Sequence, residues 1–220
     1  MQKSNEQNLD VATANGTARA RGRPRSFDRE AALTEATRLF WRKGYAATSV
    51  SDLTEAMGIG SPSLYAAFGS KEELYAEALH HFGERFEART WGNFRAAATA
   101  REAVAALLMD SAAALTGSCD QDDPLGCMVT LSAVGSEGHA ELGERVRAAR
   151  RLAVTRVEER LARAAAEGEL AADIDIPGLA RFVVALQNGM SILARDGASR
   201  AELEAAARHA MRAWPDRDRT

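Results

Sequence analysis

Three arginines lie within five residues near the N-terminus, in the segment RGRPRSFDRE. The guanidinium groups of Arg21, Arg23 and Arg25 each carry a fixed positive charge. The whole chain has a formal net charge of −3, so this basic cluster indicates a specific function of the N-terminal segment. Residues 1–70 hold nine basic and seven acidic side chains, a net +2, which leaves −5 for the remainder. This asymmetry favours contact of the N-terminal part with a polyanion.

Residues that could support catalysis or bind a metal are sparse. His80, His81, His139 and His209 do not form a metal-ligand spacing with the two cysteines, so we expect no metal site. The sequence has no glycine-rich phosphate loop after a strand pattern and no G-x-S-x-G motif. We therefore expect neither a catalytic site nor a cofactor, and an enzyme that uses an apolar pocket is the least favoured alternative.

Cys119 and Cys127 are eight residues apart and span a segment with loop composition, GSCDQDDPLG. They could form a disulfide on oxidation and act as a thiol switch. The more common arrangement is a loop thiol and a small buried apolar residue. Both interpretations remain open from the sequence.

The composition indicates a soluble helical protein. Of the 220 residues, 46% are apolar and 27% are charged, and only 5 are proline. Abundant Ala, Leu, Glu and Arg favour helices, so we expect an all-α fold. We see no apolar run of about 18 residues and no N-terminal signal sequence, so we expect a cytoplasmic protein without a membrane partner.

Helix signals follow the basic segment closely. Apolar periodicity and capping residues predict three short helices and a longer fourth helix from Lys71 to about Phe86. The expected N-caps are Asp28, Ser49, Ser61 and Ser70, and the expected stops are Gly44 and Gly58. A tight turn that contains glycine joins the second and third helices, as in a helix-turn-helix.

The third helix has an unusual outward face. Leu64 and Phe68 lie one turn apart and are expected to point inward, which places Ala66 directly outward. The neighbours of Ala66 on that face are Pro62, Ser63 and Tyr65. This face contains no acidic residue, so it could approach a groove closely while Tyr65 reaches a phosphate.

The segment FWRKGYAATSVSDLTEAMGIGSPSLYAAFGSKEELYAEAL, residues 40–79, resembles the TetR family of bacterial transcription repressors. The GY-x-x-TSV-x-D-L start, the G-I-x-x-x-S-L-Y-x-x-F turn and helix, and the S-K-E-x-L opening match in order and spacing. The resemblance implies an all-helical homodimer with an N-terminal DNA-binding domain and a larger ligand-binding domain.

The resemblance also implies roles for individual residues. Thr48, Ser49, Tyr65 and Lys71 would contact phosphates. Ser61, Ser63 and Ala66 would face bases. The pair Ala66-Ala67 departs from a common family pattern with bulkier side chains, so this helix should make few direct hydrogen bonds to DNA bases.

Arg21, Gly22, Arg23 and Pro24 resemble the core of an AT-hook. Pro24 disfavours a helix at Arg23 and keeps the segment extended. A narrow A·T minor groove attracts inserted arginines, so we expect Arg21, Arg23 and Arg25 to contact the minor groove. A solvated basic tail is the alternative.

The remaining sequence predicts a long helix over about 139–167, a helix that starts near Pro177 with an apolar stripe, and a last helix capped by Ser199 and Glu202. We expect the last two helices to form a dimer interface, in which Ala185 and Gly189 permit close packing. The alternative is that the stripe packs only within the subunit.

We expect a pocket among the middle helices, because methionines and aromatic residues suit an adaptable apolar site. Its polar anchors would be Gln187 and Asn188, although each lining residue could instead be plain core. The expected lining residues are Trp91, Phe94, Leu108, Met109, Met128, Leu131, Phe182 and Met190.

These expectations define four parts: a basic arm at 1–26, a helix-turn-helix domain at 27–72, a ligand-binding and dimerisation domain at 73–214, and a tail at 215–220. The expected function is that of a repressor that binds a pseudo-palindromic double-stranded DNA operator as a dimer. A small, largely apolar effector would release it. A thiol-switched repressor of the same fold, using Cys119 and Cys127, is the alternative.

Overall fold

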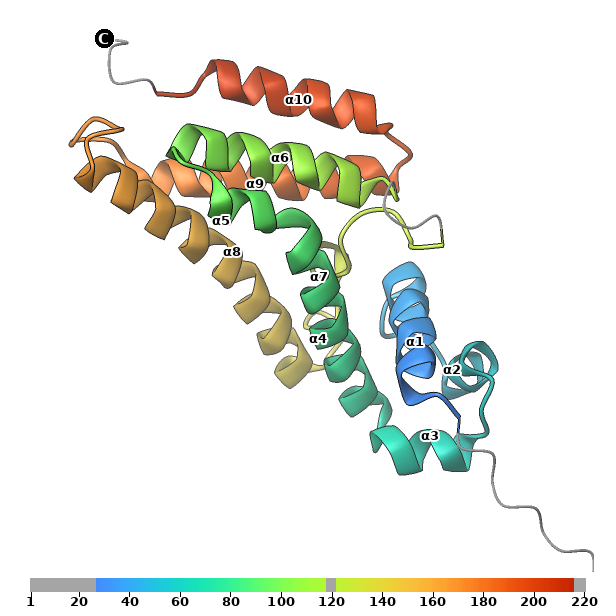
Figure 1. Cartoon of the computed structure of the whole chain (residues 1–220). Helices are drawn as coiled ribbons and strands as arrows, with labels where there is room; N and C mark the ends of the chain where they lie inside the picture. Colours follow the sequence, from blue (N-terminus) through green and yellow to red (C-terminus); the bar gives the residue numbers. More distant parts are fainter. Residues whose placement is uncertain (1–26, 118–121, 216–220) are drawn as a thin grey trace, which may run out of the picture.

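The computed structural model describes residues 27–117 and 122–215, and each regular element within them is a helix (Figure 1). The expected all-α fold class is confirmed. The arginines of the N-terminal arm, Cys119 and residues 216–220 lie outside the described residues. The helices are α1 (Arg29–Lys43), α2 (Val50–Met57), α3 (Ser61–Phe68), α4 (Lys71–Thr90), α5 (Gly92–Ala96), α6 (Ala100–Leu115), α7 (Met128–Leu131), α8 (Ala140–Ala166), α9 (Ile176–Arg195) and α10 (Arg200–Arg212).

The first helices begin where the capping residues predict. The side chain of Asp28 accepts hydrogen bonds from two backbone N–H groups in the first turn of α1. Ser49 and Asp52 form a capping box at α2, and Ser70 and Glu73 form another at α4. These reciprocal bonds satisfy backbone donors that the helix itself leaves unpaired.

The start of α3 differs from the prediction by one residue. Gly60, not Ser61, is the N-cap, because Gly60 has an extended backbone and its carbonyl accepts the N–H of Leu64. Ser61 is the first helical residue, and its side chain makes no capping bond. Pro62 lies in the first turn, where its missing N–H removes no helical hydrogen bond.

Helix α4 connects the helix-turn-helix to the rest of the molecule (Figure 1). It extends about one turn beyond the predicted end at Phe86, and it packs along α1. Tyr75 meets Phe40 edge-on with ring centroids 5.0 Å apart, and Phe82 meets Trp41 at 4.9 Å. The two parts therefore share one apolar core, and the expected boundary at residue 72 falls inside the first turn of α4.

The C-terminal part is built around α6, which packs against α9 and α10. The 27-residue α8 packs along α9 and extends toward the N-terminal half of α4 (Figure 1). The predicted capping box of Ser199 and Glu202 opens α10. These helices enclose the space in which the sequence predicts a pocket.

Helix α9 is apolar on two faces, not one. Val183 and Met190 are buried, whereas Phe182, Ile192 and Leu193 are each about half exposed, at 51%, 52% and 51%. The prediction that Phe182 lines an internal pocket is wrong, because its side chain is half exposed on the outer face of α9. Among the described residues, only α9 is long and apolar enough to resemble a membrane span, with a mean hydropathy of 1.2.

A buried carboxylate joins the two parts of the chain. Asp123, in the segment between α6 and α7, is 8% exposed and faces three arginines. The Arg38 Nε lies 3.1 Å from its Oδ1, and the Arg89 Nη1 lies 3.0 Å from its Oδ2. Arg85 lies 3.6 Å away. Because Arg38 belongs to α1 and the other two belong to α4, Asp123 holds these helices against the C-terminal part.

Candidate DNA-binding surface and effector cavity

The outward face of α3 has the composition that the sequence indicates. Leu64 and Phe68 are buried, and Ser61, Pro62, Ser63, Tyr65 and Ala66 are exposed. The Tyr65 side chain is half exposed at 49%, so its hydroxyl can reach outward. Together these residues form a small, acid-free surface that can lie in a groove with a phosphate contact at its edge.

An arginine that the sequence reading missed fixes the orientation of α3. Arg29, at the start of α1, donates from both terminal nitrogens to Glu77 on α4, at 2.6 and 2.8 Å. Its Nη2 also donates to the carbonyl of Ala67 at 3.3 Å, and its guanidinium lies 4.4 Å from the ring centre of Phe68. Arg29 therefore ties α1, α3 and α4 together, and only its place beside the basic segment marked it in the sequence.

The residues at the start of α2 are not equally available. Thr48 is fully buried and its hydroxyl donates to the carbonyl of Gly44 at 2.6 Å. The expectation that the Thr48 side chain holds a phosphate does not fit this arrangement, because the hydroxyl closes the turn before α2. Ser49 is exposed at the helix N-terminus, where the helix dipole favours an anion.

Lys71 begins α4 beside the end of α3. Its Nζ lies 4.1 Å from the ring centre of Tyr45, and partial burial lowers the pKa of Lys71. The Tyr45 hydroxyl donates to Glu72 at 2.6 Å, which fixes the ring under the ammonium group. Lys71 thus has a defined position, and its contact with a phosphate remains a prediction.

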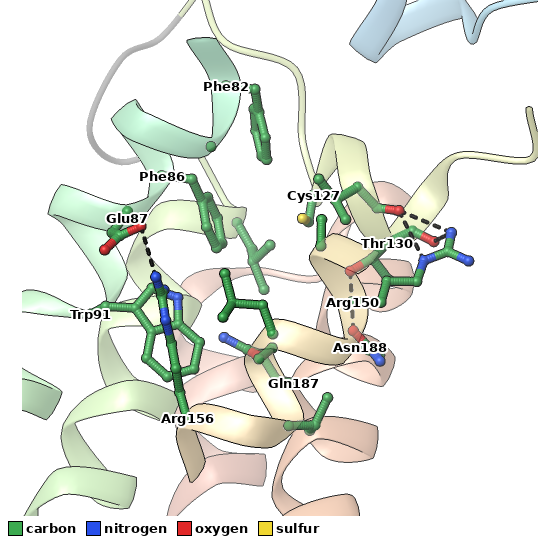
Figure 2. Close-up of a pocket in the computed structure, with 17 residues that line it drawn as sticks. Phe82, Phe86, Glu87, Trp91, Cys127, Thr130, Arg150, Arg156, Gln187 and Asn188 are labelled. Atoms are coloured by element: carbon green, nitrogen blue, oxygen red, sulfur yellow. Dashed lines mark hydrogen bonds and ion pairs between the residues drawn. The ribbon is translucent and has the colours of Figure 1, made fainter. Parts of the chain in front are cut away.

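A cavity of about 150 Å³ lies between α4, α7, α8 and α9 (Figure 2). Apolar side chains supply most of its wall, with a few polar groups among them. The lining residues are Phe82, Gly83, Phe86, Glu87, Trp91, Leu115, Cys127, Val129, Thr130, Ala149, Arg150, Leu152, Ala153, Arg156, Val184, Gln187 and Asn188. Such a wall suits a small, largely apolar molecule held by a few polar contacts.

The polar groups in the cavity wall already have partners. Thr130 donates to the Asn188 Oδ1 at 3.0 Å, and the Gln187 Nε2 donates to the Ser111 hydroxyl at 2.8 Å. Arg150 donates to three carbonyls at the end of α7, with distances between 2.8 and 3.1 Å. These bonds hold α7 against α8 and α9 and thereby shape the cavity (Figure 2).

Three of the predicted pocket residues, Trp91, Gln187 and Asn188, line this cavity. The others lie elsewhere, because residue type alone does not say on which face of a helix a cavity opens. Phe94 packs on Trp91 at 5.1 Å and lines a neighbouring groove, Met109 faces α10, and Phe182 is exposed. The remaining four, which are not among the lining residues, are Leu108, Met128, Leu131 and Met190.

Several residues that line the cavity were not predicted from the sequence. Phe82 and Phe86 stack with ring centroids 5.3 Å apart and form one wall of the cavity. Arg150 and Arg156 come from a charged helix whose exposed pattern gave no sign of a pocket. Their pairing partners, from α7 and α4, become visible only in the folded chain.

Cys127 lies in the cavity wall as a buried free thiol. Burial raises the pKa of the Cys127 thiol, which favours the protonated and less reactive form. Among the described residues, no group of three or more His, Cys, Asp or Glu side chains could hold a metal ion.

Comparison with known proteins agrees with this arrangement. The sequence model of the bacterial regulatory proteins of the tetR family matches residues 32–78. The HTH-type transcriptional repressor ComR of Escherichia coli (strain K12) is 34% identical over 200 residues, which cover 90% of this chain and 94% of ComR. The HTH-type transcriptional repressor BdcR of the same organism is 48% identical over 65 residues, which cover 30% of this chain and 33% of BdcR.

Solved structures give the same result over the whole fold. A cysteine mutant of the TetR family transcriptional regulator CifR, complexed with 26-bp double-strand operator DNA, is 41% identical, with a TM-score of 0.81. The match covers 88% of this chain and all of the CifR chain. This chain therefore belongs to the TetR family of bacterial regulatory proteins and is a DNA-binding transcriptional regulator, not an enzyme.

Proposed function

We propose that this regulator is a cytoplasmic repressor that binds a pseudo-palindromic operator as a homodimer and is released by a small, largely apolar effector. The observation that supports this most directly is the position of α4. One end of α4 carries Lys71 beside the exposed face of α3, and the other end carries Phe82, Phe86 and Glu87 in the cavity wall. An effector in the cavity can therefore act on the element that positions the DNA-binding surface.

The proposed dimer uses the exposed face of α9. Phe182, Ala185 and Leu193 are exposed, and Leu186 and Gly189 are partly exposed on the same side. A methyl group at Gly189 would meet no atom within 4 Å, so a second helix can approach there. The outward side of α10 is mainly alanine and charged residues, so α9 would provide most of the apolar contact between two subunits.

The proposed DNA contacts combine α3 with its neighbours. Ser61, Ser63 and Ala66 would face bases, while Ser49, Tyr65 and Lys71 would contact phosphates. Phe27, where the described chain begins, lies 6.5 Å from Phe68 at the end of α3. The basic arm would therefore start beside the major groove and reach the adjacent minor groove with Arg21, Arg23 and Arg25.

Footprinting and band-shift assays on the genomic DNA that flanks the gene test this function. We expect one protected site with two half-sites related by a two-fold axis. The dissociation constant should be about 10⁻⁸ M or lower, as is usual for specific protein–DNA complexes. Protein without residues 1–25 should bind more weakly and show a reduced preference for A·T pairs beside the half-sites. Binding of all fragments with equal affinity would contradict the proposal.

A thiol-switched repressor remains the second candidate, because Cys127 lies in the cavity wall. In that case oxidation of Cys127, with or without Cys119, would release the operator in place of an effector. The raised pKa of Cys127 disfavours this route. Operator binding by Cys119→Ser and Cys127→Ser variants with and without peroxide decides between the two, since a thiol switch requires at least one of these sulfur atoms.

A further inference from the structure

A second hollow adjoins the cavity and is lined mainly by arginines. This arginine groove has a volume of about 420 Å³ and lies between α5 and α8. Its lining residues are Trp91, Phe94, Arg95, Arg156, Glu159, Arg160 and Arg163. Trp91 and Arg156 line both hollows, so the groove continues the apolar cavity toward the surface.

The two hollows together carry a surplus of positive charge. Their walls contain five arginines, Arg95, Arg150, Arg156, Arg160 and Arg163, and two glutamates, Glu87 and Glu159. Two further glutamates outside the walls, Glu169 and Glu167, pair with Arg160 and Arg163. With these included, the site has five positive and four negative side chains. Apolar walls strengthen the field of such a surplus, so the combined space favours an anion over a cation.

Arg160 is the most deeply buried of these arginines, with 6% of its surface exposed. Its Nη2 donates to the carbonyl of Ala98 at 3.0 Å and lies 3.4 Å from Glu169. Its Nε and Nη1 have no hydrogen-bond partner within the described part of the chain. Because protein atoms enclose both nitrogens, Arg160 contributes positive charge to the groove and no accessible hydrogen-bond donor from these two atoms.

Arg156 stands at the junction of the cavity and the groove. Its guanidinium lies 5.3 Å from the ring centre of Trp91 and donates to the Glu87 Oε2 at 3.1 Å (Figure 2). The other oxygen of Glu87 accepts from Arg95 at 2.9 Å. Although burial by itself would raise the pKa of Glu87, the bonds from Arg156 and Arg95 outweigh it and keep this carboxylate ionised. Glu87 thus shows that a carboxylate fits between Arg156 and Arg95.

We propose that the cavity and the arginine groove form one site for an amphipathic monocarboxylate. Its apolar body would lie in the cavity, and its carboxylate would take the place of Glu87 on Arg156. This inference rests on the proposed function and names the chemical class of the effector. Because Glu87 belongs to α4 and Arg156 to α8, the exchange would free α4 from α8 and so change the position of the DNA-binding surface.

Titration calorimetry on the full chain without DNA tests this site with octanoate and 1-octanol as probes. The two share an apolar chain and differ in charge, so we expect octanoate to bind at least about tenfold more tightly. Arg156→Gln should reduce this preference to within about twofold. Glu87→Gln removes the competing carboxylate and should strengthen octanoate binding severalfold.

The matched control is Arg151→Gln on the same helix, because Arg151 pairs with Glu144 at 2.6 Å and lies outside both hollows. It should keep the wild-type preference for octanoate. Equal binding of the two probes, no binding of octanoate, or an unchanged preference in Arg156→Gln would each overturn the proposal. Operator binding by the same samples without octanoate is measured separately, so loss of this site can be distinguished from failure of the regulator function.

Discussion

At the scale of single residues, the proposed DNA-binding surface depends on a few side chains whose positions are set by their neighbours. Tyr65 is free to reach outward, whereas the Lys71 ammonium lies over the ring of Tyr45. Thr48 and Ser49 differ in exposure although they are adjacent in the chain. Residue type and order therefore indicate which groups could contact DNA, and packing decides which of them can.

Lys71→Ala should weaken binding to operator and random DNA alike, because its proposed contact is with a phosphate. Loss of one such contact in each half-site should reduce the slope of log K against log salt by about 0.9 per half-site. Tyr65→Phe should also weaken both, with an unchanged slope, since it removes a neutral hydroxyl. Salt-titrated binding measures both effects, and a change of sequence preference without loss of general affinity would contradict the assignment.

Asp52 should give the stability of the N-terminal part an acid dependence. The backbone N–H of Ser49, with the Ser49 hydroxyl and Lys43, lowers the pKa of Asp52 from 3.8 to about 2. A carboxylate whose pKa is lowered on folding contributes stability that is present above its unfolded pKa and is lost as pH falls through its folded pKa. Urea unfolding should therefore show wild type more stable than Asp52→Asn at pH 6, with the difference shrinking between pH 4 and pH 2. A difference that stays constant over this range would show that the charge of Asp52 has no role.

At the scale of elements, two polar arrangements among others hold α1 and α4 against the C-terminal part. One is the Asp123 cluster, and the other is Arg195 at the end of α9. Arg195 donates to the carbonyl of Trp41 at 3.0 Å and to the carbonyl of Leu125 at 2.8 Å. These bonds link the end of α9 to the end of α1, so they provide a connection in addition to α4 between the C-terminal helices and the proposed DNA-binding part.

Asp123→Asn should destabilise the chain, because it removes the buried carboxylate that three arginines of α1 and α4 share. Breaking a fully buried ion pair costs about 3–5 kcal/mol, and the partial exposure of these arginines reduces the expected loss to about 2 kcal/mol. Glu144→Gln is the control, since Glu144 also contacts two arginines, but all three side chains are exposed. It should cost clearly less than Asp123→Asn in the same urea unfolding experiment, because solvent screens exposed ion pairs. Equal losses in the two variants would remove the structural role assigned to Asp123.

At the scale of the whole molecule, the proposed function requires two subunits with a defined separation. Two α3 helices can enter successive major grooves only when their separation is about 34–36 Å, one turn of DNA. The exposed apolar face of α9 is proposed to hold the subunits, while α4 sets the position of α3 within each subunit. In the proposed function, subunit contact and effector response would therefore act on the same distance.

Leu193→Glu should disrupt the dimer, because it places a charge on each side of an apolar contact. We expect sedimentation to give a monomer and operator affinity to fall by at least about a hundredfold, while helix content stays unchanged. Arg151→Glu, on the exposed side of α8 and outside the hollow beside the start of α4, should leave both measurements as in wild type. A dimeric Leu193→Glu protein would place the subunit interface elsewhere.

Effector and operator should weaken each other by the same factor, because allosteric coupling between two binding sites is reciprocal. If octanoate lowers operator affinity, operator must lower octanoate affinity equally, by about 5–150-fold for a typical coupling free energy. Calorimetry of octanoate with and without an operator duplex measures this. Identical octanoate affinities in the two titrations would exclude this mode of release.

Much of the fold could be predicted from the sequence, because helix signals are local. Two helix starts were predicted from capping boxes, Ser49 with Asp52 and Ser70 with Glu73, and the structure contains both. The site was predicted less completely. Trp91, Gln187 and Asn188 line the cavity, but Arg150 and Arg156 were missed because their partners come from other helices.

The sequence by itself determined the helical class, the helix-turn-helix with its acid-free α3 face, and the family. These properties depend on residues within a few turns of one another, where capping bonds and helical periodicity act. Tertiary structure alone decided that Phe182 and Leu193 face outward, that Thr48 is buried, and that Asp123 meets three arginines. It also decided where the cavity and the arginine groove open. The physical reason is that burial and charge pairing depend on which distant helices pack together, and no single stretch of sequence contains that information.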